Sequence, residues 1–211
     1  VSETQTALIL ALHFDMVPDE FRPRLLDALE KNIGAHKTHL LTGFIGTPFA
    51  CLTLSENGRH DLAGKLLLQE DDPSWLYEVR VGATTVWERW DGLNENGECP
   101  IGDDGTDMMI SYNHYASGAV GAFLYRRVLG VEPTEAGYRK FKFAPVVGGG
   151  ITEAEGTVGT PYGVIKAAWK IADGEMTMTV AVPVGTECTV VLPSGEEKVL
   201  GSGEYTDTAK A

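Results

Sequence analysis

Basic residues are scarce in this chain of 211 residues, which carries 17 Lys and Arg against 30 Asp and Glu and a formal net charge of -13. A surface of that sign repels the phosphates of nucleic acids and the headgroups of anionic membranes. No apolar run approaches the roughly 20 residues that a helix needs to cross a bilayer. We therefore expect neither a nucleic acid nor a membrane among the partners of this chain.

Cysteine is also rare, and the three that are present, Cys51, Cys99 and Cys188, lie far apart without a C-x-x-C pair. An odd number of distant thiols predicts neither a disulfide framework nor a zinc site. Four of the five histidines show no metal-ligand spacing with one another or with the cysteines. The acidic run at 103–107 is loosely similar to a calcium loop, but it is too short and lacks the final Glu, so we expect a solvated turn. The sequence predicts no metal and no cofactor.

The first part of the chain shows helical periodicity interrupted by capping and turn residues. Ser2 or Thr4 suits the N-cap of a helix that runs through Phe14. Paired helices joined by short loops are typical of an α/α toroid built from helical hairpins. Further helices are expected over residues 18–34, 47–55, 61–69, 74–81 and 108–129.

The pattern changes near Gly130, after which apolar and polar residues alternate with a two-residue period between turn signals. The clearest hairpin joins residues 163–171 to residues 176–182 through Asp173-Gly174, a dipeptide that favours a type I′ turn. We expect an antiparallel β-sandwich of about six to eight short strands. This part contains a single tryptophan, Trp169, and no acidic cluster, so a structural role is expected for it.

These two patterns divide the chain into a partial (α/α)6 toroid over residues 1–130 and an antiparallel β-sandwich over residues 131–211. About three helical hairpins can be counted, which is about half of what a closed six-hairpin toroid needs. We therefore expect a fragment of a longer protein. The hairpin faces that it exposes favour self-association.

A single carboxylate, Glu88, lies between Trp87 and Trp90 in the segment 82–92. Indole rings stack on the apolar faces of pyranose rings, and a carboxylate in such a wall acts as a general acid or base once its surroundings tune its pKa. The alternative is packing, because two tryptophans three residues apart share one face of a helix. From these residues alone, a sugar site and a core segment both stay open.

A second candidate is His114, which lies among polar and aromatic residues at the expected start of a helix. Helix starts of a toroid face its mouth, so this imidazole is placed to donate a hydrogen bond to a sugar hydroxyl or to the carboxylate. A backbone carbonyl would satisfy it equally well. Trp75, upstream of Glu88, either adds to an aromatic cleft or packs at a hairpin joint. The segment 41–49, with two glycines before a proline, is expected to form a loop at the same mouth.

Five motifs follow one another along the chain: TGFIGT (42–47), LSENG (54–58), LLQEDDPSWLY (67–77), GATTVWERWD (82–91) and YNHYA (112–116). Together they closely resemble the bacterial α-L-rhamnosidase family of inverting glycoside hydrolases. The resemblance covers nearly the whole chain. It implies the last third or so of a six-hairpin α/α catalytic domain, followed by the C-terminal β-sandwich of the family.

The resemblance also implies roles for single residues and a rhamnose-containing glycoside as substrate. Glu88 of the Thr-Thr-x-Trp-Glu motif would be the general base, and His114 of the Asn-His-Tyr motif would contact the rhamnose ring. Trp90 and Trp75 are the further expected substrate contacts. An inverting enzyme also needs a general acid roughly 6.5 to 9.5 Å from the base. In the family that acid lies in an earlier motif without a counterpart here, so we expect weak activity or none from this chain alone.

Two other functions remain open from the sequence. In the first, the chain is a non-catalytic carbohydrate-binding or structural fragment in which the β-sandwich is the stable unit. In the second, it belongs to an α/α-toroid enzyme acting on another sugar or to a polysaccharide lyase, because one fold hosts many chemistries. The sequence predicts no cellular location.

Overall fold

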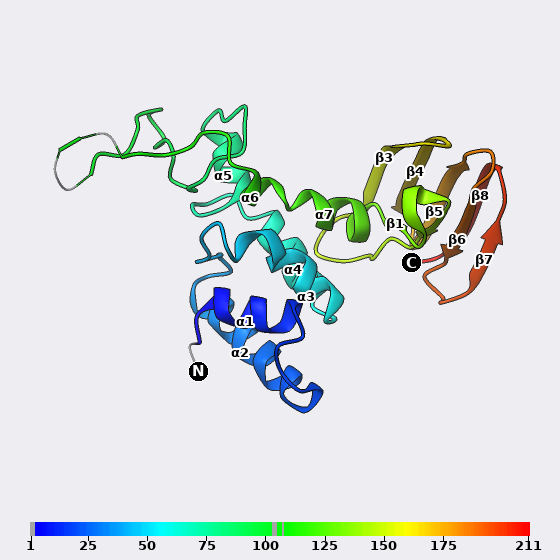
Figure 1. Ribbon diagram of the computed structural model, residues 1–211, viewed down its shortest axis with the longest axis horizontal. Coiled ribbons are helices and arrows are strands. Elements are labelled where there is room, and N and C mark those ends of the chain that lie inside the picture. The colour runs from blue at the N-terminus through cyan, green and yellow to red at the C-terminus, as the bar shows by residue number, and fades with distance from the viewer. Residues whose placement is uncertain (1–2, 103–104, 107) are drawn as a thin grey trace. The chain divides into compact units, whose positions relative to one another are not determined.

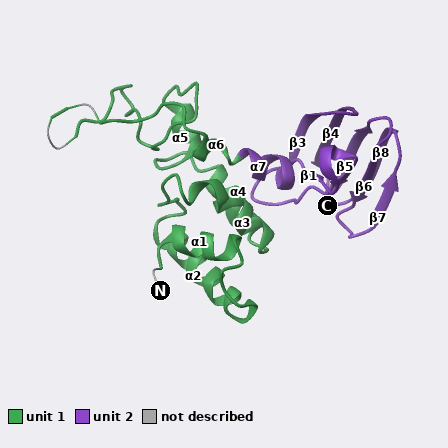
Figure 2. Ribbon diagram, in the orientation of Figure 1, with its two compact units in different colours: residues 1–120 green, residues 121–211 purple. Residues whose placement is uncertain are grey.

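The computed structural model describes residues 3–102, 105–106 and 108–211. Asp103, Asp104 and Asp107 of the predicted acidic turn lie outside the described residues. The chain forms two compact units, Val1–Val120 and Gly121–Ala211 (Figure 2). The domain boundary expected between residues 130 and 131 stays a prediction.

The first unit is built from short helices that pair as hairpins (Figure 1). Helix α1 packs against α2, and α3 packs against α4. Among the described residues, no helix is both long enough and apolar enough to cross a membrane. The elements of this unit are α1 (Gln5–His13), η1 (Asp19–Phe21), α2 (Arg22–Ala35), η2 (Thr47–Phe49), α3 (Ala50–Glu56), α4 (His60–Leu67), α5 (Trp75–Arg80) and α6 (Tyr115–Gly118). The helices expected before residue 82 are therefore confirmed.

Local sequence explains where α1 begins and which faces of the first hairpin are buried. The Thr4 hydroxyl caps α1 by accepting a hydrogen bond from the Ala7 N–H at 3.3 Å. Ser2, the other expected cap, lies outside the described residues. Apolar residues three and four positions apart share one face of a helix and pack together there. The buried apolar residues of the pair are Leu8, Ile9, Leu12, Leu26, Leu29 and Ile33.

The helix predicted over 108–129 is wrong in its first part, because residues 108–114 are not helical. Backbone groups there bond to another segment instead: the Ser111 carbonyl accepts from the Glu88 N–H, and the His114 N–H donates to the Val86 carbonyl. The helix α6 begins only after His114, which caps it. Two further helical elements belong to the second unit: α7 (Gly121–Phe123) and the π-helical turn η3 (Leu124–Val128).

The second unit is a β-sandwich of two four-stranded sheets, with strand orders β1-β2-β6-β7 and β3-β4-β5-β8. The strands are β1 (Val131–Pro133), β2 (Lys140–Phe143), β3 (Glu153–Thr160), β4 (Gly163–Ala172), β5 (Glu175–Val182), β6 (Glu187–Val191), β7 (Glu197–Leu200) and β8 (Gly203–Lys210), with a short η4 (Ala136–Tyr138) before β2. The predicted sandwich is confirmed, but not every pair is antiparallel: β2 and β6 run parallel. A parallel pair needs a long crossover, and here the strands β3, β4 and β5 of the other sheet supply it.

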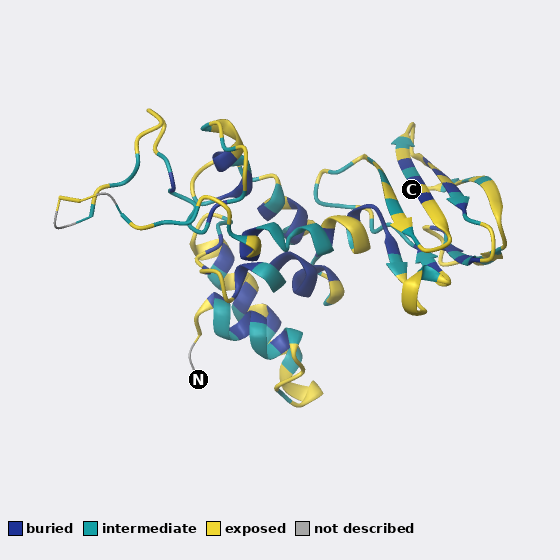
Figure 3. Ribbon diagram, turned by 45° about the horizontal axis from the view of Figure 1, so that its top comes forward, coloured by how far each residue is buried: buried dark blue, intermediate teal, exposed yellow. Residues whose placement is uncertain are grey.

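Buried residues alternate with exposed ones along the strands (Figure 3). The buried residues of both sheets form the core of the sandwich. In β5, Met176, Met178 and Val180 are buried and the residues between them are exposed. The expected hairpin joins β4 to β5 through Asp173 and Gly174, which both have positive φ, 53° and 79°. Trp169 is 2% exposed, and its Nε1–H donates to the Val128 carbonyl at 2.7 Å. The single tryptophan of this unit is therefore part of its core.

Candidate active site

Two irregular segments of the first unit, residues 85–88 and 111–114, lie side by side and carry the two main candidates. The Glu88 N–H donates to the Ser111 carbonyl at 2.9 Å, and the His114 N–H donates to the Val86 carbonyl at 2.8 Å. The Thr85 hydroxyl adds a hydrogen bond to the Tyr112 carbonyl. The structure thus brings the segments of Glu88 and His114 together, although 26 residues separate the two in sequence.

The Glu88 side chain is partly buried, and a backbone group orients it. Its Oε2 accepts a hydrogen bond from the Ser111 N–H at 2.9 Å. Next to it, Arg89 holds Asp91 through two hydrogen bonds, Nε to Oδ1 at 3.0 Å and Nη2 to Oδ2 at 2.9 Å. These hydrogen bonds lower the pKa of Asp91 and raise that of Arg89, and the charge of Glu88 also adds to the shift of Arg89. Glu88 is therefore a fixed carboxylate beside a permanently charged guanidinium.

His114 is partly buried and is the N-cap of α6. Its Nδ1 accepts a hydrogen bond from the Ala116 N–H at 3.3 Å, so the proton of the neutral imidazole belongs on Nε2. That leaves the Nε2–H as a donor for another group. Two aromatic rings lie near this imidazole. Phe44 of the predicted mouth loop is 5.7 Å away between ring centroids, and Tyr115 is 5.7 Å away in a stacked arrangement.

The tryptophans of this region do not share a helix face, because residues 82–90 are not helical. Trp87 is 3% exposed and packs edge-on against Tyr112. Trp90 is partly exposed and contacts Trp75 edge-on, with 5.1 Å between ring centroids. Trp75 itself is buried, and its Nε1–H donates to the Ser117 carbonyl at 3.0 Å. Trp87 is thus a core residue, whereas Trp90 retains an accessible surface.

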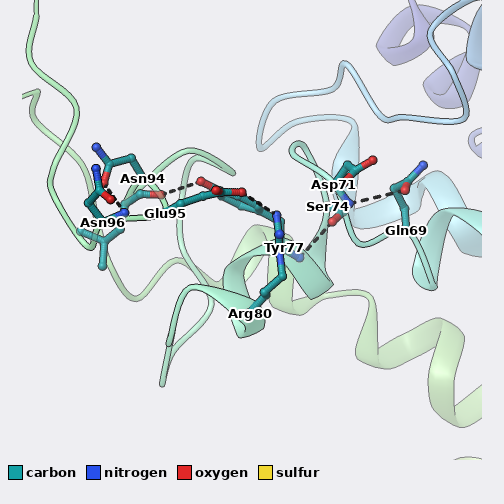
Figure 4. Close-up of polar contacts among 9 residues, drawn as sticks. Gln69, Asp71, Ser74, Tyr77, Arg80, Asn94, Glu95 and Asn96 are labelled. Carbon is teal, nitrogen blue, oxygen red and sulfur yellow. Dashed lines mark hydrogen bonds and ion pairs between the residues drawn. The ribbon is translucent and has the colours of Figure 1, made fainter.

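The helix α5 contacts neighbouring segments of the first unit, and its ion pair with Glu95 is drawn in Figure 4. Its first turn is capped by the Ser74 hydroxyl, which accepts from the Tyr77 N–H at 3.0 Å. The Tyr77 hydroxyl donates to the Leu93 carbonyl at 3.1 Å, and Arg80 forms an ion pair with Glu95 at 3.1 Å. Trp75 from the same helix reaches the segment after His114, as described above. A six-residue helix thus contacts both the loop at residues 93–95 and the helix α6.

Sequence reasoning missed one residue of this helix, Glu78. This residue is 3% exposed, and its Oε2 accepts a hydrogen bond from the Trp87 N–H at 3.2 Å. Trp87 is the residue that directly precedes Glu88 in the sequence. Burial raises the pKa of Glu78 from an ordinary 4.5 to about 7, and the hydrogen bond from Trp87 opposes this shift. Glu78 also lines a hollow of about 250 Å³ together with Trp75 and residues 83–86. Its place three residues after Trp75, on the buried face of a helix, was the signal available in the sequence.

No metal site is evident in the part of the chain that the structure describes, where no cluster of three or more His, Cys, Asp or Glu side chains is suited to hold an ion. The thiols of Cys51 and Cys188 are buried, and burial raises the pKa of each to about 12. Such thiols stay protonated and do not act as nucleophiles at neutral pH. Any reaction in this region would therefore depend on Glu88, on His114 and on the ionisable side chains beside them.

Family models match nearly the whole chain. Residues 1–128 match the bacterial alpha-L-rhamnosidase 6 hairpin glycosidase domain, and residues 130–207 match the bacterial alpha-L-rhamnosidase C-terminal domain. An alpha-L-rhamnosidase of Formosa agariphila is 38% identical over 201 residues, which are 95% of this chain and 21% of the relative. One of Streptomyces avermitilis is 38% identical over 192 residues, 91% of this chain and 18% of the relative. The chain spans about a fifth of the length of these relatives.

Solved structures of similar proteins agree with this match. The Streptomyces avermitilis alpha-L-rhamnosidase complexed with L-rhamnose has a TM-score of 0.88 and 34% identity, covering 99% of this chain and 22% of that chain. The native α-L-rhamnosidase of Aspergillus terreus has a TM-score of 0.88 and 36% identity, covering 98% of this chain and 24% of that chain. The predicted fold class, a helical part followed by a β-sandwich, is confirmed. The chain therefore belongs to the bacterial α-L-rhamnosidase family.

Proposed function

We propose that this chain is the part of an inverting α-L-rhamnosidase that supplies the general base, Glu88, and one side of the sugar site. The observation that carries the proposal is the pairing of residues 85–88 with residues 111–114, which brings Glu88 and His114 onto neighbouring segments. The hydrogen bond from the Ser111 N–H orients the Glu88 carboxylate. Family membership supports a terminal α-L-rhamnosyl group as the substrate.

In the proposed reaction the Glu88 carboxylate takes a proton from a water molecule while the water oxygen attacks the anomeric carbon. The bond from that carbon to the aglycone oxygen breaks on the opposite face, and a general acid gives its proton to the departing oxygen. The products are rhamnose with inverted anomeric configuration and the free alcohol. The Nε2–H of His114 donates to a sugar hydroxyl, and Trp90 offers an indole face to the ring. Trp75 acts on the sugar only through its edge contact with Trp90.

We further propose that the general acid comes from a part of the enzyme outside these residues. Glu78 has the raised pKa that a general acid requires. However, it is 3% exposed, and its Oε2 accepts from the Trp87 N–H. A glycosidic oxygen has no access to a carboxyl group that is buried in this way. A second carboxyl group on the other side of the sugar is therefore required.

Substrates that differ in their need for an acid test this division of roles. Fluoride leaves without protonation, whereas the methoxide of methyl α-L-rhamnoside does not. We expect this chain to hydrolyse α-L-rhamnosyl fluoride slowly and to leave the methyl rhamnoside intact. Glu88→Gln should abolish the fluoride reaction, whereas the control Glu95→Gln, which changes an exposed carboxylate, should not. Equal rates for Glu88→Gln and the unchanged chain would remove Glu88 from the mechanism.

A sugar-binding sandwich would need an aromatic ring on which a sugar can stack, and Trp169 is the single tryptophan of the second unit. Its indole is 2% exposed and its N–H is bonded to the Val128 carbonyl, so it offers no face to a sugar. Among the four tryptophans, Trp90 is the one near Glu88 with accessible surface. Binding of L-rhamnose that survives Trp169→Phe and is lost in Trp90→Ala would support the site in the first unit.

A further inference from the structure

The environment of Glu78 is unusual for a carboxyl group. Its Oε1 is buried without a hydrogen-bond partner within the described part of the chain, and its Oε2 has the Trp87 N–H as a partner at 3.2 Å. A buried polar atom without a partner destabilises a fold, and a buried charge without a counter-ion does so more strongly. An apolar residue would fill this place at lower cost. The retained carboxyl group therefore points to a role for its one hydrogen bond.

That hydrogen bond belongs to a chain of contacts that leads to the candidate base. Trp87 is covalently next to Glu88, whose N–H donates to the Ser111 carbonyl. In return the Ser111 N–H donates to Oε2 of Glu88. The position of the Trp87 backbone thus determines where the Glu88 carboxylate meets the Ser111 N–H.

The other end of this chain of contacts is the helix α5, which is itself held in place. The Ser74 hydroxyl caps its first turn, and Arg80 pairs with Glu95 at 3.1 Å (Figure 4). The Glu78 carbonyl adds a second bond to the following loop, because it accepts from the Ala83 N–H at 2.9 Å. Glu78 therefore connects a fixed helix to the irregular segment that carries Glu88.

We propose that Glu78 is a positioning residue, which holds the Glu88 carboxylate against the Ser111 N–H by accepting the hydrogen bond of the Trp87 backbone. The inference rests on the proposed function in so far as Glu88 is the base. Glu78 does not touch the sugar, because its side chain is buried. What it supplies is one acceptor oxygen, and a neutral amide in the same place supplies the same oxygen.

Three variants separate this role from simple packing. Glu78→Gln keeps the acceptor for Trp87, Glu78→Met keeps the volume without an acceptor, and Glu56→Gln changes an exposed control carboxylate at the end of α3. Amide hydrogen exchange, measured by NMR, is followed at Trp87 and at Ser111. The Ser111 amide is the direct reporter, since its partner is the Glu88 side chain. Thermal unfolding of each variant shows whether the fold as a whole is changed.

In Glu78→Met we expect exchange at Trp87 and at Ser111 to speed up by about tenfold, the factor that corresponds to about 1.4 kcal/mol for one hydrogen bond. Glu78→Gln and Glu56→Gln should leave the exchange of both amides unchanged. With α-L-rhamnosyl fluoride, Glu78→Met should lower kcat by about tenfold while KM changes by less than about twofold, because a misplaced base affects turnover rather than binding. If Glu78→Met does not fold, Glu78→Asp takes its place, since it withdraws the carboxyl group by one methylene.

Faster exchange at Trp87 with unchanged exchange at Ser111 would overturn the proposal, because the effect would then stop before Glu88. Loss of hydrolysis in Glu78→Gln with both amides still protected would also overturn it, since Glu78 would then be a reacting group. Failure of the proposed function has a different signature. In that case Glu88→Gln leaves hydrolysis unchanged, whatever the exchange at Ser111 shows.

Discussion

The stability of the first unit should depend on pH through Glu78, and the variant Glu78→Gln measures how strongly. Burial raises the pKa of this carboxyl group from 4.5 to about 7. Well below pH 4.5 the group is protonated in both the folded and the unfolded chain, so its ionisation makes no contribution to the free energy of unfolding. Between 4.5 and about 7 the unfolded chain loses the proton and the folded chain keeps it, so the free energy of unfolding falls as the pH rises.

The size of the effect follows from the shift. Each pKa unit corresponds to about 1.4 kcal/mol, so the complete penalty is about 3 kcal/mol, of which about 2.5 kcal/mol develops between about pH 5 and about pH 8. Glu78 is 3% exposed, so solvent screens this cost little. Glu78→Gln has no proton to lose and keeps the acceptor for the Trp87 N–H. We expect the free energy of unfolding of Glu78→Gln to be close to that of the unchanged chain at about pH 5 and about 2 to 3 kcal/mol higher at about pH 8.

Urea unfolding followed by tryptophan fluorescence is the suitable assay, because Trp75, Trp87 and Trp90 all lie in the first unit. The quantity to compare is the free energy of unfolding of Glu78→Gln minus that of the unchanged chain at each pH. The titration of the histidines is common to both proteins and cancels in this difference. Trp169→Phe in both proteins removes the signal of the second unit. A difference that is the same at both pH values would refute the reasoning, since Glu78 would then titrate alike in the folded and unfolded chain.

Four further predictions test other parts of the structure. Thr4→Ala should lower the stability of the first unit by about 1 kcal/mol in urea unfolding, because α1 loses its cap. Trp169→Phe should lower the stability of the second unit by about 1 to 2 kcal/mol in urea unfolding followed by far-UV circular dichroism, since the Val128 carbonyl loses its hydrogen bond from the indole N–H. His114→Ala should weaken L-rhamnose binding by about tenfold in a fluorescence titration, the factor of one lost hydrogen bond. Light scattering should show a dimer or larger species, because large apolar side chains such as Phe44 are exposed, and a clean monomer would contradict this.

Elements with a local signal could be predicted from the sequence. The hairpin at Asp173-Gly174 formed as expected, because the dipeptide itself favours the positive φ values that the turn requires. The cap at Thr4 was equally local. The helix expected over residues 108–129 did not form in its first part, because Ser111 and His114 use their backbone groups to bind residues more than twenty positions away. The parallel pairing of β2 with β6 was missed for the same reason, since a crossover between two sheets leaves no trace in a local pattern.

For the candidate site, the sequence could indicate residue types but not their surroundings. Glu88 and His114 stand out in distinctive motifs, and their segments do meet. Trp87 and Trp90 look equivalent in sequence, yet one is 3% exposed and the other is partly accessible. Glu78 carries no signal beyond its spacing from Trp75. Its importance depends on an atom that only the structure shows, the N–H of Trp87.

The arrangement of α5 explains how an irregular segment can hold a reacting group. Sites built on loops are less precise than sites built on helices or strands, unless supporting contacts fix the loops. Glu88 lies in such a loop, and neither of its flanking segments has repeating backbone hydrogen bonds. The supporting contacts come instead from Tyr77, Glu78 and Arg80, which bind the segments on both sides of it. Because each contact fixes a different point of the loop, loss of one should displace Glu88 without unfolding the helix that the others still hold.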